Sequence, residues 1–246
     1  MDLNFRVHKV AKLVRAGGRH VAAFHGERDP LIRQIRAQRL TFLEANALRD
    51  LQELAVCVER AQMTGSIIEA GCALGGSAIL LARSKAISRP LYVYDVFGMI
   101  PAPSDADGDD VQDRYADIVG GKARGIGPSD LYYGYESDLI RKVSSNFRRF
   151  AVDIENHNVI LVKGRFQETL FPEGPVCLVH IDADWYESVK VCLERIWPAL
   201  VPGGVIVIDD YDSWSGCHRA VDEFLSTATD CEMRRRSRLQ LVKLKR

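Results

Sequence analysis

Several features that define particular protein classes are missing from this chain of 246 residues. Its 33 Lys and Arg residues balance 33 Asp and Glu residues, so there is no excess positive charge for a polyanion. Apolar runs such as Val205–Ile208 are far shorter than the ~20 residues of a membrane span. Residues 1–10 lack the apolar core of a signal peptide. We therefore expect a cytoplasmic protein that does not bind nucleic acid and does not insert stably into a membrane.

The six cysteines lack the spacing of a metal site or a disulfide framework. They form no CxxC pair and have no closely spaced histidine, which a zinc site needs. We expect free, mostly buried thiols in a reducing compartment. The chain also lacks the GxGxxG spacing of a dinucleotide site, which argues against a nicotinamide oxidoreductase.

What the chain does contain is an alternation of short apolar runs with helical patterns. Apolar runs predict strands at 66–69, 91–95, 159–162, 176–181 and 204–208. Helical spacing is present over 41–63, 78–87 and 189–197. Continuous apolar runs joined by helices are typical of parallel strands buried on both faces. We expect one α/β domain over residues 1–246, with an open, mostly parallel Rossmann-like sheet, helices on both faces and an edge strand at 239–244.

Two segments depart from this alternation. Residues 1–40 are basic, and Leu3, Val7, Val10 and Val14 recur at helical spacing, which predicts an amphipathic N-terminal arm. Residues 97–157 form a long interval between two strands, with an acidic stretch at 105–117 and a helical pattern at 139–150. We interpret 97–157 as a lid or substrate-binding insertion. Its basic residues either receive a phosphate or carboxylate or are simply solvated; they are Arg141, Lys142, Arg148 and Arg149.

The first group of candidate site residues lies in a glycine-rich turn between a strand and a helix. Its members are Glu69, Gly71, Gly75, Gly76 and Ser77. Glycine allows close approach of a ligand to the backbone, and the new helix offers free N–H groups. Asp95 ends the next strand, where a carboxylate can accept hydrogen bonds from the hydroxyls of a ribose. This pattern predicts a site for a nucleoside without a pyrophosphate, such as S-adenosylmethionine.

The second group consists of acidic residues that follow two later strands. Asp182 and Asp184 follow one strand, and Asp209 and Asp210 follow the next. Carboxylates in one crevice repel each other, and a divalent cation removes that cost. Oxygen ligands favour magnesium, calcium or manganese over zinc. The competing interpretation is that these acids cap helices or pair with an arginine, namely Arg195 or Arg219.

Five segments, in this order, resemble the macrocin O-methyltransferase family, whose members tailor sugars of antibiotics. They are 69–77, 163–172, 180–188, 202–211 and 216–224. The resemblance implies a class I methyltransferase fold, S-adenosylmethionine and Mg²⁺. It also implies Asp182, Asp209 and Asp210 as metal ligands and Asp184 as the general base. Asp182 is expected to serve catalysis and the cofactor as well as the metal.

Weaker candidates complete the set. Gly164, Phe166 and Gln167 follow the strand where such folds place the adenine. Trp185 and Tyr186 either hold a sugar face or pack. His180 and His218 are alternative bases, and three insertion tyrosines either contact substrate or pack, namely Tyr132, Tyr133 and Tyr135.

The leading hypothesis is an S-adenosylmethionine- and Mg²⁺-dependent O-methyltransferase acting on a hydroxyl of a sugar or glycosylated product, as a homodimer. A metal-dependent glycosyltransferase using the Asp-Ala-Asp motif is an alternative, but it leaves the glycine turn without a ligand. A non-catalytic nucleoside-binding module is a further alternative.

Overall fold

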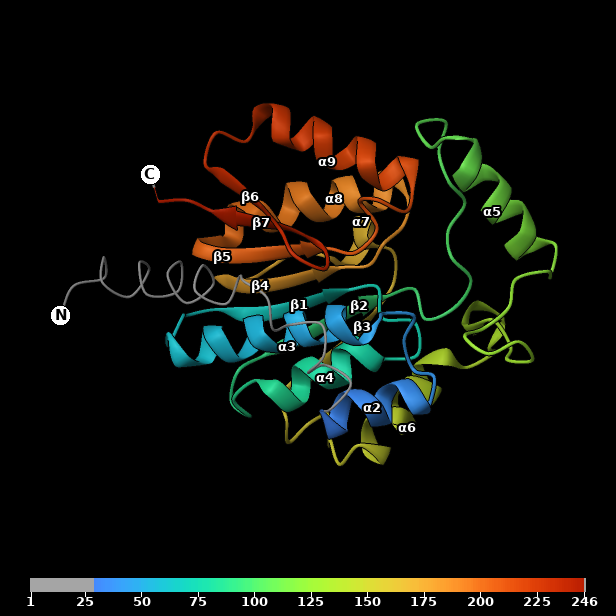
Figure 1. Ribbon diagram of the computed structural model, residues 1–246, viewed down its shortest axis with the longest axis horizontal. Helices are drawn as coiled ribbons and strands as arrows, with labels where there is room; N and C mark the ends of the chain where they lie inside the picture. The colour runs from blue at the N-terminus through green and yellow to red at the C-terminus, as the bar shows by residue number, and fades with distance from the viewer. Residues whose placement is uncertain (1–28, 246) are drawn as a thin grey trace.

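The structure is a computed structural model that describes residues 29–245. Seven strands form one sheet in the order β3-β2-β1-β4-β5-β7-β6 (Figure 1). In chain order the strands are β1 (Ser66–Ala70), β2 (Leu91–Asp95), β3 (Val159–Lys163), β4 (Val176–Ile181), β5 (Leu200–Ile208), β6 (Cys231–Arg235) and β7 (Leu239–Lys243). β1 to β5 pair in parallel, and β7 is antiparallel to both β5 and β6. The expected open, mostly parallel α/β sheet is confirmed.

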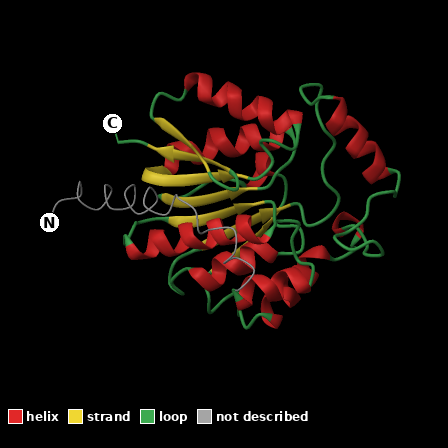
Figure 2. Ribbon diagram, viewed as in Figure 1, coloured by secondary structure: helices red, strands yellow, loops and turns green. Residues whose placement is uncertain are grey.

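Helices cover both faces of the sheet (Figure 2). One face carries α2 (Pro30–Ala37), α3 (Ala45–Arg60), α4 (Gly76–Ser84) and α6 (Leu139–Arg149). The other face carries α7 (Phe166–Thr169), α8 (Tyr186–Ile196) and α9 (Ser215–Thr227). Successive strand residues point to opposite faces, so Ile67 belongs to the first apolar core and Ile68 to the second.

The order of the last strands corrects one prediction. The strand expected at the sheet edge over 239–244 is β7, and it lies between β5 and β6. β6 occupies the edge and escaped detection because charged residues such as Glu232, Arg234 and Arg235 interrupt its apolar pattern. Charged residues on an edge strand discourage pairing with other chains.

The insertion divides into two parts. α6 packs into the first core through Leu139, Val143 and Phe147. α5 (Asp109–Val119) lies beyond the carboxyl edge of the sheet, where Val111 and Ile118 join a small separate cluster (Figure 1). Residues 109–117 of the acidic stretch are thus helical, and Asp109 and Asp110 in the first turn interact favourably with the helix dipole.

Three further expectations concern the N-terminal arm, membrane-spanning helices and the cysteines. The amphipathic arm predicted from Leu3, Val7, Val10 and Val14 lies outside the described residues. Within residues 29–245 no helix is long and apolar enough to cross a membrane. All six cysteines are free thiols, as expected.

Candidate active site

A pocket opens at the carboxyl ends of β1, β2 and β4. Six of the predicted site residues line it: Gly71, Asp95, Phe166, Gln167, Asp182 and Asp184. Tyr133 from the insertion also lines it, together with residues that sequence reasoning did not single out, among them Arg165, Pro101 and Ser188. The remaining predicted residues lie behind or beside the pocket: Glu69, Gly75, Gly76, Ser77, Gly164, Asp209 and Asp210.

The glycines of the turn have different roles. Gly71 has φ +88°, and a Cβ on it would lie 1.8 Å from the backbone oxygen of Asp182. Only glycine therefore fits where the turn passes the end of β4. Gly76 faces away from the pocket, since its N–H donates to the Leu40 carbonyl at 3.0 Å and a Cβ there would lie 2.7 Å from that oxygen. Gly76 thus allows α4 to pack closely against the segment after α2.

Asp95 ties the two loops of the pocket together. Its Oδ2 accepts from the Cys72 N–H at 2.8 Å, and its Oδ1 accepts from the Phe97 N–H at 2.7 Å. Burial raises the pKa of Asp95 even though these N–H groups favour the ionised form. Each oxygen keeps a lone pair for a further donor.

Three non-glycine residues next to the pocket have left-handed backbone conformations. Ala73 has φ 45°, Phe97 has φ 47° and Asp184 has φ 55°. Such conformations cost free energy and persist only where surrounding contacts enforce them. Each follows a strand end, so the loops that build the pocket carry part of the backbone strain of the molecule.

Three acids gather at the ends of β4 and β5. Ligand-capable oxygens of Asp182, Asp184 and Asp210 lie within 4.8 Å of one another. Asp210 Oδ2 is buried and has no hydrogen-bond partner among the described residues. Burial and the neighbouring carboxylates hold the pKa values of Asp182 and Asp210 well above their usual range and raise that of Asp184 to about 6. An all-oxygen group with an unsatisfied oxygen fits a hard divalent cation.

The competing interpretation of these acids finds no support in the arginines it named. Arg195 donates to the carbonyls of Phe166 and Gln167, both at 2.8 Å. Arg219 pairs with Glu223 at 2.9 Å. Neither arginine neutralises the acids at the strand ends.

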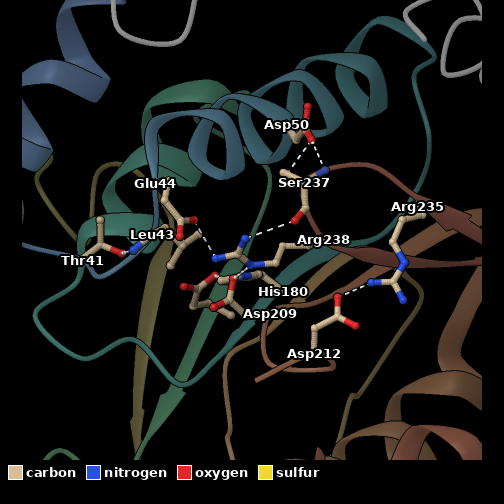
Figure 3. A network of polar contacts seen from close by, with 11 residues as sticks. Thr41, Leu43, Glu44, Asp50, His180, Asp209, Asp212, Arg235, Ser237 and Arg238 are labelled. Atoms are coloured by element: carbon tan, nitrogen blue, oxygen red, sulfur yellow. Dashed lines mark hydrogen bonds and ion pairs between the residues drawn. The ribbon is translucent and has the colours of Figure 1, made fainter. Parts of the chain in front are cut away.

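Asp209 is placed differently from the expected ligand set. Its Oδ1 accepts from Arg238 Nε at 2.7 Å and lies 3.7 Å from His180 Nε2, so it belongs to a neighbouring chain of charges (Figure 3). His180 Nδ1 lies 3.2 Å from Glu69 Oε2, and Ser77 donates to Glu69. Because its carboxylate already contacts His180 and Ser77, Glu69 does not reach the pocket.

The Glu69–His180 pair lies inside the sheet. Glu69 and His180 are fully buried and are register partners on β1 and β4. Burial disfavours a charged His180, but Glu69 and Asp209 outweigh it and hold its pKa well above the usual value. Burial would raise the pKa of Asp209, but His180 and Arg238 outweigh this effect, and the pKa lies below its usual value.

The turn between β6 and β7 fixes Arg238 against α3. Arg238 Nη2 donates to Glu44 at 2.8 Å, and the Ser237 N–H donates to Asp50 at 2.9 Å (Figure 3). Arg236 adds ion pairs to Asp50 and Glu53, both at 3.0 Å. No local motif links residues separated by almost 190 positions, so sequence reasoning missed this contact.

The other candidates make packing or polar contacts outside the pocket. Trp185 is 2% exposed and its indole N–H donates to the Pro101 carbonyl at 3.0 Å. Tyr186 bonds to Glu223, and His218 is exposed and stacks on Tyr211 with ring centroids 4.3 Å apart. Neither His180 nor His218 lines the pocket.

The sheet order and the position of the pocket define the class I methyltransferase fold. Residues 18–127 and 128–231 match the Macrocin-O-methyltransferase (TylF) family, and the chain belongs to this family. The resemblance inferred from the five segments is thereby confirmed.

Two curated relatives from Streptomyces are similar over 187 residues, which is 72% of this chain. One is 8-demethyl-8-(2,3-dimethoxy-alpha-L-rhamnosyl)-tetracenomycin-C 4'-O-methyltransferase of Streptomyces olivaceus, with 29% identity. The other is demethyldecarbamoylnovobiocin O-methyltransferase of Streptomyces niveus, with 28% identity. The match spans 65% of the length of each relative. Among solved structures, the O-methyltransferase NovP aligns with a TM-score of 0.70 and 21% identity, over 99% of this chain and 98% of that one, which supports the fold.

Proposed function

We propose that this protein is an S-adenosylmethionine-dependent O-methyltransferase that requires Mg²⁺ and acts on a hydroxyl of a sugar-type acceptor. The observation that carries the proposal is the group of unpaired acids beside a pocket walled by Gly71 and Asp95. A nucleoside cradle and a hard-cation group at one strand edge suit transfer of a methyl group to a poorly acidic hydroxyl. The names of the curated relatives support a sugar as the acceptor.

Asp95 and the β3 side of the pocket hold the methyl donor in this proposal. Asp95 accepts hydrogen bonds from the ribose hydroxyls through its remaining lone pairs, and Gly71 allows the tight turn that lines the donor side of the pocket. Phe166 and Gln167 flank the adenine, because they line the pocket beyond β3. S-adenosylmethionine supplies a methyl group already activated on a sulfonium.

Asp182 and Asp210 hold the cation. Mg²⁺ is usually bound through one or two carboxylates and keeps several waters, so two aspartates suffice. Asp209 is left out of the ligand set because Arg238 and His180 already satisfy it. When bound, the cation lowers the pKa of an acceptor oxygen and orients it.

Asp184 takes the proton from the acceptor hydroxyl. It lines the pocket, and its carboxylate lies beside those of Asp182 and Asp210, where it can accept the proton of a bound hydroxyl. His180 is buried between two acids and His218 lies outside the pocket, so neither reaches the acceptor. The protein's further contribution is positioning, with the acceptor oxygen ~3–3.5 Å from the methyl carbon.

Calorimetry with S-adenosylmethionine, with and without Mg²⁺, tests the proposal directly. Asp95→Ala should weaken donor binding about 10- to 150-fold, or ~1.5–3 kcal/mol, because it removes hydrogen bonds to a charged group. Asp210→Asn should bind the donor normally but lose Mg²⁺ affinity. The matched control is Asp212→Asn, since Asp212 is exposed and pairs only with Arg235 among the described residues.

The alternatives predict other outcomes. A glycosyltransferase would bind Mg²⁺ but not S-adenosylmethionine. A binding module would bind the donor but form no S-adenosylhomocysteine with any glycoside tested. Full turnover in excess chelator would exclude the cation from the mechanism.

A further inference from the structure

A second cavity lies beside the active-site pocket, and its lining includes three basic side chains and one acidic side chain, Asp130. This basic cavity has a volume of about 560 Å³ and lies between the end of α2, residues 125–131 of the insertion, and α6. Arg39 follows α2, while Lys142 and Arg149 project from α6. Tyr133 lines both the basic cavity and the active-site pocket, so the two spaces are neighbours.

The positive charge of the basic cavity is only partly neutralised. Arg39 Nη1 lies 3.0 Å from Asp130 Oδ1, and Lys142 pairs with Glu136. Arg149 has no carboxylate within 4.0 Å among residues 29–245. One cation of the cavity therefore remains available to an anion from outside.

A buried amide orients this arginine. Asn146 is 4% exposed, its Nδ2 donates to the Leu74 carbonyl at 2.9 Å, and its Oδ1 accepts from Arg149 Nη1 at 3.3 Å. Leu74 belongs to the glycine-rich turn, so Arg149 is connected to the active-site loop through one side chain. Phe42, which is 51% exposed and lies 6.4 Å from the Tyr133 ring, adds an apolar wall.

The two spaces differ in how much of an acceptor they can hold. The active-site pocket must already hold the donor and the reacting edge of the acceptor. The remainder of the acceptor must extend outward, and Tyr133 marks the route to the basic cavity.

We propose that the basic cavity binds an anionic group, a phosphate or a carboxylate, that the acceptor carries at a distance from the methylated hydroxyl. The inference rests on the proposed function, because it assigns the rest of the same acceptor. Arg149 is the principal donor, since charge-assisted hydrogen bonds from a guanidinium to either anion are strong. Arg39 and Lys142 add positive charge but are shared with acids of the chain.

Calorimetry on the full chain with three probes tests this assignment. UDP supplies phosphates without the adenosine of the methyl donor, p-nitrophenyl glucuronide supplies a carboxylate, and p-nitrophenyl glucoside is its neutral counterpart. Arg149→Glu should weaken binding of the anionic probe by about tenfold or more, because a charge-assisted bond becomes a repulsion. The control is Arg148→Glu, which changes an exposed residue of α6 outside the cavity and should alter affinity less than about twofold.

The probes also distinguish the source of the anion. Arg149-dependent binding of UDP supports a phosphate-bearing acceptor, and Arg149-dependent binding of the glucuronide supports a carboxylate-bearing one. Equal losses in the two variants, or equal affinity for glucuronide and glucoside with no UDP binding, would overturn the inference.

The affinity for S-adenosylmethionine, measured in the same preparations, separates the two proposals. Normal donor binding without anion binding removes the basic cavity from the acceptor site and leaves the methyltransferase proposal intact. Arg149-dependent anion binding without donor binding removes the methyltransferase proposal and retains the anion site.

Discussion

Two groups of charged side chains share the carboxyl ends of β4 and β5. Asp182, Asp184 and Asp210 lie together, and none of them forms an ion pair within 4.0 Å with a cation of residues 29–245. The neighbouring group, from Glu69 through His180 and Asp209 to Arg238, alternates in charge. The residue types are similar, and the partners differ. Aspartates that the chain itself neutralises stabilise the fold, while those left unpaired remain available for a ligand.

Contacts beyond the end of β5 produce this division. Asp209 and Asp210 both follow β5, and their carboxylates meet different partners although the residues are neighbours in sequence. Asp209 turns toward the α3 side, where Arg238 lies, and Asp210 toward the other acids. Asp209 is thus neutralised by the protein itself, and Asp210 remains available to a ligand.

The largest expected effect is on turnover and comes from the unpaired group. Asp184→Asn should slow methyl transfer by about 10²–10⁴-fold, the typical contribution of a general base. The loss should persist at saturating Mg²⁺ because the ligands Asp182 and Asp210 remain. Steady-state formation of S-adenosylhomocysteine measures it. His218→Ala is the control and should keep near-normal turnover; the reverse pattern would transfer the role of base to the histidine.

A smaller effect, on stability, is expected from the paired group. Arg238→Met removes the guanidinium that donates to Asp209 and leaves only His180, 3.7 Å away, as its cation. We expect the free energy of unfolding to fall by about 2–4 kcal/mol, because Asp209 is largely buried. Urea unfolding measures this loss. Arg235→Met removes a similar pair with Asp212 at an exposed position and should cost less than about 1 kcal/mol. Equal losses would show that burial does not distinguish the two pairs.

The smallest effect concerns a paired charge remote from the site and depends on pH. Burial raises the pKa of Glu59, but Arg89, whose Nη2 lies 3.2 Å from Glu59 Oε2, outweighs it and the pKa falls below its usual value of 4.5. A carboxyl group whose pKa is lower in the folded state stabilises the fold at pH values above its unfolded-state pKa. This stabilisation is lost as the pH falls through the folded-state pKa. Glu59→Gln should therefore lower the free energy of unfolding at pH 7 by up to about 1 kcal/mol and by less at pH 3, as followed by urea unfolding. Asp117→Asn, in an exposed pair with Lys122, should show no such pH dependence.

Local patterns in the sequence predict most of the fold. The strands β2 and β4 have the predicted bounds, 91–95 and 176–181, because a strand buried on both faces reads as a continuous apolar run. β6 and α5 were not predicted, since their charged residues mask the apolar positions that pack. Their structure depends on tertiary contacts more than on local pattern.

The candidate site divides in the same way. Gly71, Asp95 and the acids at strand ends were identifiable, because the carboxyl ends of parallel strands meet at one edge. The position of Asp209 was not, because its partner Arg238 comes from a distant turn. The homodimer and the individual ligand roles stay predictions.

The short helix α7 shows how the pocket wall is held. Four residues are too few to form a stable helix on their own. Arg195 of α8 donates to the carbonyls of Phe166, Gln167 and Leu170, and its guanidinium lies 4.0 Å from the Phe171 ring centroid. We therefore expect that, in native-state amide exchange, α7 opens together with the cooperative unit that contains α8. The wall expected to face the adenine therefore stays ordered only as long as the next helix along the chain does.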